Sequence, residues 1–179
     1  MNQLAGGEGM KNLLIIGAGG QGKVVKETAD ALGRFERIEF LDDMNPKAIG
    51  KLEEMGQFRN QFDCIFPAVG NNELRRKIME NAKKMNYEVP VLVHPTAYVS
   101  PSATLGNGTI VEAMAVIHTK AVVEEGCIIA IGALVDHEAL IEKYTYINCG
   151  TIVKANAKVG QLLTIPSEII VTKEEMKNE

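Results

Sequence analysis

One short segment carries residue types suited to general acid–base catalysis: Asp136, His137 and Glu138 place an imidazole between two carboxylates. An imidazole changes protonation state near neutral pH, so it can take a proton from an attacking nucleophile. A carboxylate bonded to one ring nitrogen fixes the tautomer and raises the basicity of the other nitrogen. Consecutive side chains of an extended strand point to opposite faces, so the sequence leaves open whether Asp136 or Glu138 reaches the ring, the latter around a bend. We expect His137 to be a general base.

Two further histidines are weaker candidates for the base. His118 has no acidic neighbour in sequence, and His94, which precedes a proline, is expected to be an extended residue at a junction. Three histidines also raise the question of a zinc site, as in the γ-type carbonic anhydrases. Their positions in the repeat described next do not bring three imidazoles to one point, so we expect no metal.

These candidates lie in a segment with a strict period of six. An aliphatic residue occupies twelve consecutive hexad positions: Val93, Val99, Leu105, Val111, Ile117, Val123, Ile129, Val135, Ile141, Ile147, Val153 and Val159. Four positions after each of them the residue is small, except at Leu163. A period of six fits neither a helix nor an alternating strand, and it predicts a parallel β-helix with three hexads per triangular turn. Residues eighteen apart then lie above one another, which places His137 between Thr119 and Ala155.

The end of the repeat is less regular. The register continues at Ile165 and Val171, but Leu163 and Ile169 occupy the slot for a small residue. We therefore expect an imperfect last coil and a tail that caps the prism.

The segment before the repeat predicts a strand, a glycine turn and a helix. Residues 11–16 are a compact apolar run, GAGGQG follows at 17–22, and an amphipathic helix extends to Gly33. Glycines allow close approach to a pyrophosphate, and the helix N-terminus offers free N–H groups. Because the spacing is G-x-G-G-x-G and not G-x-G-x-x-G, a tight turn without a ligand is the alternative.

Polar residues follow the second and third predicted strands. Residues 37–41 end at Asp42 and Asp43, about as far from the glycine turn as the acidic residue that meets a ribose in dinucleotide folds. A solvated turn explains that pair equally well.

The third strand, residues 63–69, ends at Gly70 and Asn71, and a helix over residues 73–85 places Arg75 near the same sheet edge. Ligands bind at that edge of parallel sheets, so Arg75 could contact a phosphate, although most arginines near helix starts lie at the surface. We expect residues 87–93 to form the last strand of this sheet.

Composition bounds the partners and the location. A net charge of −4 over 179 residues, with 23% charged residues, offers no basic stripe, so we expect neither nucleic acid nor membrane as a partner. Three cysteines without metal-type spacing indicate reduced thiols, and no leader or long apolar run is present, so we expect a cytoplasmic protein. The expected division is a disordered extension at 1–9, a nucleotide-binding α/β domain at 10–92, a β-helix at 93–171 and a polar tail at 172–179.

Five motifs in one order carry a family resemblance: the glycine turn, LDD, GNNELRRKI, HPTAYVSPSA and VDHE. Over residues 10 to about 160 the chain resembles bacterial sugar-nucleotide acyltransferases of the sialic acid O-acetyltransferase and UDP-4-amino-sugar N-acetyltransferase type. The resemblance implies a Rossmann-like nucleotide-sugar domain, a left-handed β-helix, a homotrimer, and acetyl-CoA as co-substrate between adjacent solenoids.

The resemblance also implies roles for individual residues. His137 corresponds to the catalytic base and Glu138 to the residue that raises its basicity. The implied sugar-nucleotide contacts are Gly19, Gly20, Gln21, Asp42, Asp43, Val69, Gly70 and Asn71. We expect cofactor contacts at Tyr146 and Ala155. The sequence departs from the family at Gln21, where histidine is usual, at Ala130, where an asparagine assists, and at Tyr146, where a second histidine contacts the cofactor.

The expected activity is transfer of an acetyl group from acetyl-CoA to the amine of a nucleotide-activated 4-amino sugar, a step of glycan biosynthesis. One alternative is O-acetylation of sialic acid or another sugar. The other is a trimer that binds a nucleotide sugar without transferring acetyl, which the departures at Ala130 and Tyr146 would favour.

Overall fold

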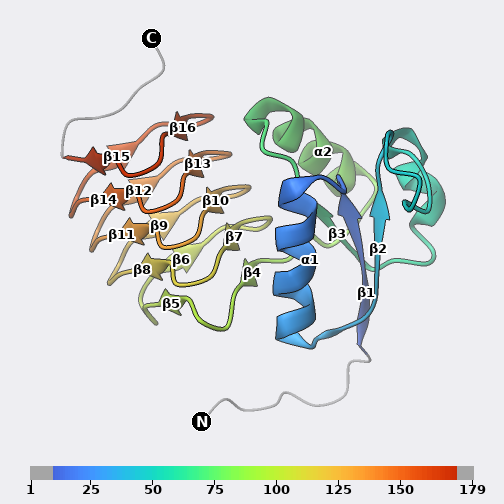
Figure 1. Ribbon diagram of the computed structural model, residues 1–179, viewed down its shortest axis with the longest axis horizontal. Coiled ribbons are helices and arrows are strands. Elements are labelled where there is room, and N and C mark those ends of the chain that lie inside the picture. The colour runs from blue at the N-terminus through green and yellow to red at the C-terminus, as the bar shows by residue number, and fades with distance from the viewer. Residues whose placement is uncertain (1–9, 173–179) are drawn as a thin grey trace.

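The computed structural model describes residues 10–172, and it contains a small α/β unit beside a three-sided prism (Figure 1). The expected extension at 1–9 and all but the first residue of the tail expected at 172–179 lie outside the described residues.

The α/β unit is built on a three-stranded parallel sheet in the order β2-β1-β3. Its elements are β1 (Lys11–Ile16), α1 (Gly20–Leu32), β2 (Phe35–Leu41), the 3-10 helix η1 (Leu52–Phe58), β3 (Cys64–Pro67) and α2 (Asn72–Lys84). The last four residues of the central strand β1 are all apolar and buried, because both faces of the sheet are covered there. Leu13 and Ile15 pack with α1, whereas Leu14 and Ile16 pack with α2 and η1.

This strand order creates a topological switch between β1 and β3. The chain leaves β1 for α1 on one face of the sheet and leaves β3 for α2 on the other. A crevice opens outside the carboxyl ends of two such strands, and ligands bind there in open parallel sheets. The glycine turn after β1 and the segment Ala68–Asn71 after β3 border this crevice.

The strand expected over residues 87–93 is not part of this sheet. Glu88 makes only an isolated bridge to Cys64, and Leu92–Val93 forms β4, the first strand of the prism. Pro90 lies between them and has no N–H to continue the pairing.

The prism consists of three stacks of two-residue parallel strands. The contact sheet, which faces the α/β unit, holds β4 (Leu92–Val93), β7 (Ile110–Val111), β10 (Ile128–Ile129), β13 (Tyr146–Ile147) and β16 (Thr164–Ile165). The second sheet holds β5 (Tyr98–Val99), β8 (Val116–Ile117), β11 (Leu134–Val135), β14 (Ile152–Val153) and β17 (Ile170–Val171). The third sheet holds β6 (Thr104–Leu105), β9 (Val122–Val123), β12 (Leu140–Ile141) and β15 (Lys158–Val159).

The hexad pattern is the cause of this architecture. Strands pair with a register of eighteen residues, as in Ile129 with Ile147, and the hexad aliphatics form one internal core. Small residues occupy the bends, and the polar ones among them satisfy buried carbonyls: Thr109 Oγ1 donates to Glu124 O at 2.8 Å. The strand register expected to continue at Ile165 and Val171 does so, since β16 and β17 pair with β13 and β14 and Val171 is 1% exposed. Ile169, in the slot for a small residue, is 38% exposed, so the last coil keeps its register but lacks a buried residue at that bend.

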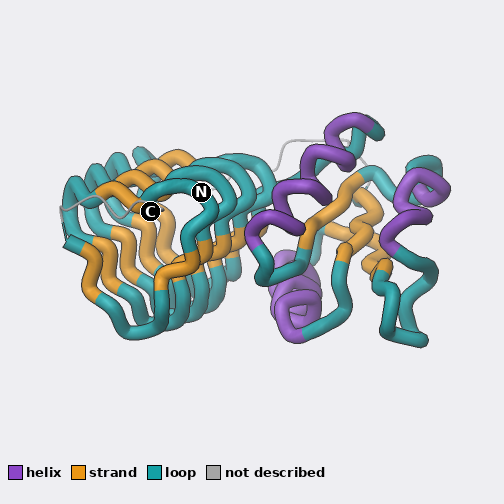
Figure 2. Tube along the Cα trace, turned by 90° about the horizontal axis from the view of Figure 1, so that it is seen from above, coloured by secondary structure: helices purple, strands orange, loops and turns teal. Residues whose placement is uncertain are grey.

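Three corners join the three sheets, and each is named here by one residue. The Glu112 corner joins the contact sheet to the second sheet, the His137 corner joins the second to the third, and the Gly126 corner joins the third back to the contact sheet. Figure 2, seen from above, shows the prism with one side toward the α/β unit. The His137 corner is therefore the one opposite the contact sheet. No helix among the described residues is long and apolar enough to cross a membrane.

Candidate functional site

The His137 corner presents an exposed imidazole beside a carboxylate. Glu138 has a left-handed backbone with φ of 58°, and this bend turns its side chain toward the preceding residue. Glu138 Oε2 lies 3.7 Å from His137 Nδ1, and both side chains are about half exposed. The separation exceeds that of a hydrogen bond, but catalytic hydrogen bonds are often long without substrate and shorten in the complex. The pairing leaves His137 Nε2 available as a base.

Asp136, the other acidic neighbour, is engaged elsewhere. Its Oδ1 accepts the backbone N–H of His137 at 2.7 Å and lies 3.8 Å from Nδ1 of His118. The backbone hydrogen bond, followed by the two nearby histidines, lowers the pKa of the Asp136 carboxyl. The sequence left open whether Asp136 or Glu138 reaches the His137 ring, and these contacts favour Glu138.

The glycine turn lies at the carboxyl end of β1 with open space above it. A Cβ on Gly17 would lie 2.9 Å from Ala68 O, and one on Gly22 would lie 2.1 Å from Gly17 O, so both positions require glycine. At Gly19 and Gly20, by contrast, a Cβ would meet nothing within 4 Å. Helix α1 begins here without a side-chain cap or an acidic residue in its first turn. Its first N–H groups are thus free to receive an anion such as phosphate.

Asp42 organises the loop beside this turn. Its carboxylate accepts the backbone N–H groups of Ala18, Met44 and Asn45 at 2.7 to 2.8 Å. The bond from Ala18, followed by that from Met44, lowers the pKa of Asp42 despite partial burial. A hollow of about 540 Å³ opens next to it, lined by Ala18, Gly19, Asp42, Met44, Asn45 and Pro46. Asp43 is exposed and accepts the backbone N–H of Leu52 at 3.0 Å.

The segment after β3 borders the same crevice. Val69 is half-buried, Gly70 and Asn71 are exposed, and Asn71 caps α2 by accepting the N–H of Leu74 at 2.9 Å. The structure thus brings Gly19, Gly20, Asp42, Asp43 and this segment to one edge of the sheet.

Arg75 does not face this crevice, which corrects the phosphate contact considered from sequence. Its side chain is completely buried, and its guanidinium donates to the carbonyls of Gly126, Tyr144, Val69 and Gly70 and to Oδ1 of Asn72. Burial lowers its pKa to about 10, which still leaves it charged at neutral pH. Arg75 joins the strand-end segment to two coils of the prism and cannot reach a ligand.

Gln21 meets a residue that the sequence did not single out. Its Nε2 donates to Oε1 of Glu112 at 2.9 Å, and Glu112 is only 7% exposed. Oε2 of the same carboxylate accepts the N–H of Ile131, one coil above, at 3.0 Å. In sequence Glu112 is indistinguishable from Glu124 and Glu142, which make the same coil-to-coil bond at the Gly126 corner.

The two expected cofactor contacts lie on different sides of the prism. Tyr146 is on β13 of the contact sheet, packed with the residues that join the prism to the α/β unit, and its ring edge approaches Gly70. Burial, followed by the charge of Glu112, raises the pKa of Tyr146. Ala155 lies in the His137 corner, where the next residue, Asn156, donates its N–H to His137 O at 3.1 Å. Ala130 is 1% exposed at the Glu112 corner.

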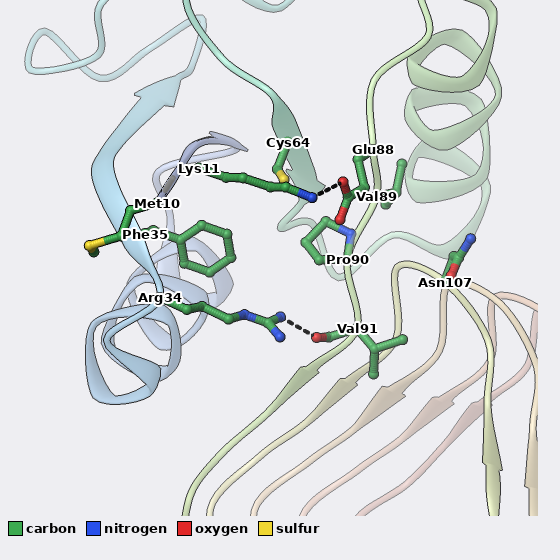
Figure 3. Close-up of a pocket in the computed structure, with 10 residues that line it drawn as sticks. All are labelled: Met10, Lys11, Arg34, Phe35, Cys64, Glu88, Val89, Pro90, Val91 and Asn107. Atoms are coloured by element: carbon green, nitrogen blue, oxygen red, sulfur yellow. Dashed lines mark hydrogen bonds and ion pairs between the residues drawn. The ribbon is translucent and has the colours of Figure 1, made fainter. Parts of the chain in front are cut away.

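Another hollow, of about 550 Å³, opens at the opposite, amino edge of the sheet (Figure 3). Its cations are already bonded, Lys11 to Glu88 at 2.7 Å and Arg34 to the carbonyl of Val91 at 2.6 Å. None of the candidate site residues lines it, so its size does not mark the site. Within residues 10–172 no group of three histidine, cysteine or acidic side chains is placed to hold a metal ion.

Comparison with known proteins places these features in context. Residues 12–82 match the PglD N-terminal domain family. The UDP-N-acetylbacillosamine N-acetyltransferase of Bacillus subtilis (strain 168) is 34% identical over an aligned stretch of 118 residues, and the match covers 58% of this chain and 52% of that protein. The match thus spans about half the length of this curated relative.

Two solved structures resemble nearly the whole chain. The acetyltransferase domain of PglB from Neisseria gonorrhoeae FA1090, in complex with acetyl coenzyme A, is 35% identical with a TM-score of 0.80, over 94% of this chain and 93% of that one. PerB from Caulobacter crescentus, in complex with CoA and GDP-perosamine, is 25% identical with a TM-score of 0.70, over 90% and 91% of the two chains. The expected fold, an α/β unit followed by a left-handed β-helix, is confirmed.

Proposed function

The chain belongs to the sugar-nucleotide acetyltransferase family, and from that premise we propose that it transfers acetyl from acetyl-CoA to the amine of a nucleotide-linked amino sugar. The observation that carries the proposal is the half-exposed His137 imidazole with Glu138 beside its Nδ1. The names of the Bacillus relative and of the bound ligands in the two solved structures support an amine acceptor and a CoA thioester donor.

In the proposed reaction the acceptor amine attacks the thioester carbonyl while His137 Nε2 removes a proton from the nitrogen. A C–N bond forms, the C–S bond breaks, and the CoA thiolate leaves and takes up the proton from His137. Glu138 stabilises the imidazolium that exists between these steps. Amines react with thioesters directly, so no acyl-enzyme is required.

The nucleotide sugar is proposed to bind in the crevice at the carboxyl edge of the α/β sheet. The open space over Gly19 and Gly20 and the uncapped start of α1 suit a pyrophosphate. Asp42 orders the loop and Asp43 is exposed beside it, next to the hollow for the nucleoside.

Within one copy, this crevice and His137 lie on opposite sides of the prism, because the contact sheet faces the α/β unit and the His137 corner lies opposite that sheet. We therefore propose a homotrimer in which the His137 corner of one copy faces the crevice of the next. The outer face of the second sheet supports such contacts, since its outward positions are all apolar: Tyr98, Val116, Leu134, Ile152 and Ile170. Tyr98, Leu134 and Ile170 are 39% to 56% exposed, an apolar column that a neighbouring copy would cover.

In this arrangement acetyl-CoA would lie between two prisms, near Ala155 of one copy and Tyr146 of the other. The three free cysteines and the use of a CoA thioester favour the cytoplasm as the place of the reaction.

The test is thiol release from acetyl-CoA with UDP- and GDP-linked 4-amino sugars as acceptors. His137→Ala is expected to lower kcat by roughly 10²- to 10⁴-fold, the usual contribution of a general base, without changing the melting temperature. His118→Ala is the matched control, because His118 is equally exposed and its ring centroid lies 6.3 Å from that of His137. An unchanged rate in His137→Ala, or the large loss in His118→Ala, would reject the assignment of the base.

A further inference from the structure

Glu112 is a buried carboxylate without a cationic partner. It is 7% exposed, and none of the ion pairs among residues 10–172 involves it. The chemically similar Glu142 pairs with Lys158 at 2.9 Å. A buried charge without a counter-ion is costly unless hydrogen bonds or a ligand compensate for it. Two hydrogen bonds hold Glu112, one from the prism backbone at Ile131 and one from Gln21.

The bond to Gln21 fixes the direction of an amide. An ionised carboxylate only accepts hydrogen bonds, so Gln21 must turn its NH₂ group toward Glu112. The amide oxygen of Gln21 then points away from the carboxylate, and no described residue donates to it. Gln21 lies in the first turn of α1, directly after Gly19 and Gly20, which border the proposed nucleotide-sugar crevice.

Hydrogen bonding and charge both indicate which ligand group the amide oxygen of Gln21 prefers. An outward amide oxygen can only accept, so its partner must carry an N–H or O–H group. The negative charge behind it favours a partner with positive charge. The ring of Tyr146 lies beside Gly70 and is close enough to Glu112 for that charge to raise its pKa.

We propose that Glu112 is a positioning residue for acceptor specificity: by holding Gln21 with its oxygen outward, it selects an acceptor sugar that presents an amino group over one that presents a hydroxyl. The inference rests on the proposed function, because it assumes that the sugar of the nucleotide sugar reaches Gln21. The new element is that the preference for an amine comes from Gln21 and Glu112 beside the nucleotide-sugar crevice and not from His137.

The experiment measures binding by calorimetry, so it does not depend on turnover. The probes are a UDP-4-amino sugar, UDP-N-acetylglucosamine, which carries a hydroxyl at that carbon, and UDP alone. Wild type should bind the amino sugar more tightly than the hydroxyl sugar. Glu112→Gln should weaken binding of the amino sugar by about 10- to 100-fold, the range for a lost hydrogen bond to a charged group, and leave UDP unchanged.

Glu124→Gln is the matched control. Glu124 Oε2 accepts the N–H of Lys143 at 3.1 Å, the same coil-to-coil bond, at a corner remote from Gln21. This variant reports the structural cost of the substitution and should leave all three affinities unaltered. Gln21→Leu should lose the amino-sugar preference as Glu112→Gln does, and the double variant should lose no more, because the two residues act as one unit.

The inference is overturned if wild type shows no preference for the amino sugar, or if Glu112→Gln weakens UDP and the amino sugar equally. Should Glu112→Gln not fold, Gln21→Leu decides by the same comparison. An amino-sugar preference that depends on Glu112, in a protein that releases no thiol from acetyl-CoA, would reject the transfer reaction and leave this inference standing.

Discussion

Arg75 shows how strongly one residue's role depends on its surroundings. Its guanidinium donates to backbone carbonyls of Val69 and Gly70 on one side and of Gly126 and Tyr144 on the other. Asn72, one turn earlier in α2, adds bonds to the carbonyls of Leu162 and Leu163. Together these side chains fix the crevice segment to three successive coils of the prism.

We predict that Arg75→Lys destabilises the protein by about 2–4 kcal/mol, because an ammonium cannot replace five donors in a planar fork and leaves buried carbonyls unsatisfied. The free energy of unfolding in urea measures this loss. Arg76→Lys is the control. Arg76 lies on the outer face of α2, and its partners among residues 10–172 are Glu73 and Glu80, so little change is expected. Similar values for the two variants would contradict the structural role of Arg75.

At the scale of the elements, the bends of the prism place one residue in the left-handed conformation at every sixth position from Gly108 to Glu168. Glycine supplies it at Gly108, Gly126, Gly132 and Gly150, and residues with side chains supply it elsewhere, as at Glu138 and Asn156. Backbone strain alone therefore does not require glycine at every bend. Packing decides: a Cβ on Gly126 would lie 2.4 Å from Tyr144 Cδ1, whereas one on Gly132 would meet nothing within 4 Å.

The two glycines form a matched pair for a prediction. Both have φ near 70°, so alanine at either position costs about 1 kcal/mol in backbone strain. Gly126→Ala should cost roughly 1–3 kcal/mol more, because the ring of Tyr144 and the sulfur of Met79 must move. Thermal unfolding of both variants tests this, and equal melting temperatures would show that the Gly126 corner repacks freely.

At the scale of the whole molecule, the two halves of the proposed site lie on opposite sides of the prism within one copy. The Gln21–Glu112 bond and the hydrogen bonds of Arg75 tie the crevice to the contact sheet, while His137 lies at the far corner. The arrangement within one copy therefore does not bring the two halves together. This is why the proposed function includes a second copy, with the exposed apolar column on the second sheet as the proposed contact.

Subunit mixing tests this arrangement. Co-expression of His137→Ala with Gly20→Phe, which fills the open space at the start of α1, should restore roughly a quarter of wild-type activity, the statistical fraction of sites with both halves intact in a cyclic oligomer. Each variant alone should keep at most about 1% of wild-type activity, as should preformed oligomers mixed without exchange. Failure of the co-expressed pair to regain activity would mean that each copy completes its own site.

Repetition explains why so much of the fold can be predicted from this sequence. Every core position of the prism recurs eighteen residues later in an equivalent environment. The aliphatic hexad residues and the small residues at the bends can therefore be recognised from the sequence alone. The strand, glycine turn and helix at residues 11–33 are also predictable, because their signals are local. Gly17 and Gly33 have positive φ, and Gly22 packs directly on Gly17. The cluster at residues 136–138 is also visible in sequence because its members are neighbours.

Tertiary structure decided what depends on contacts between distant segments. Glu112 shares its residue type and hexad position with Glu124 and Glu142, and only the packing of α1 against the contact sheet buries it and gives it Gln21 as a partner. Arg75 turns inward because a coil fifty residues later offers it carbonyls. The period of six predicts which residues face the core of the prism. It does not predict which polar residue contacts another element, because such a contact occurs once and does not repeat. The burial of Glu112 and Arg75 therefore depends on how the α/β unit packs against the prism.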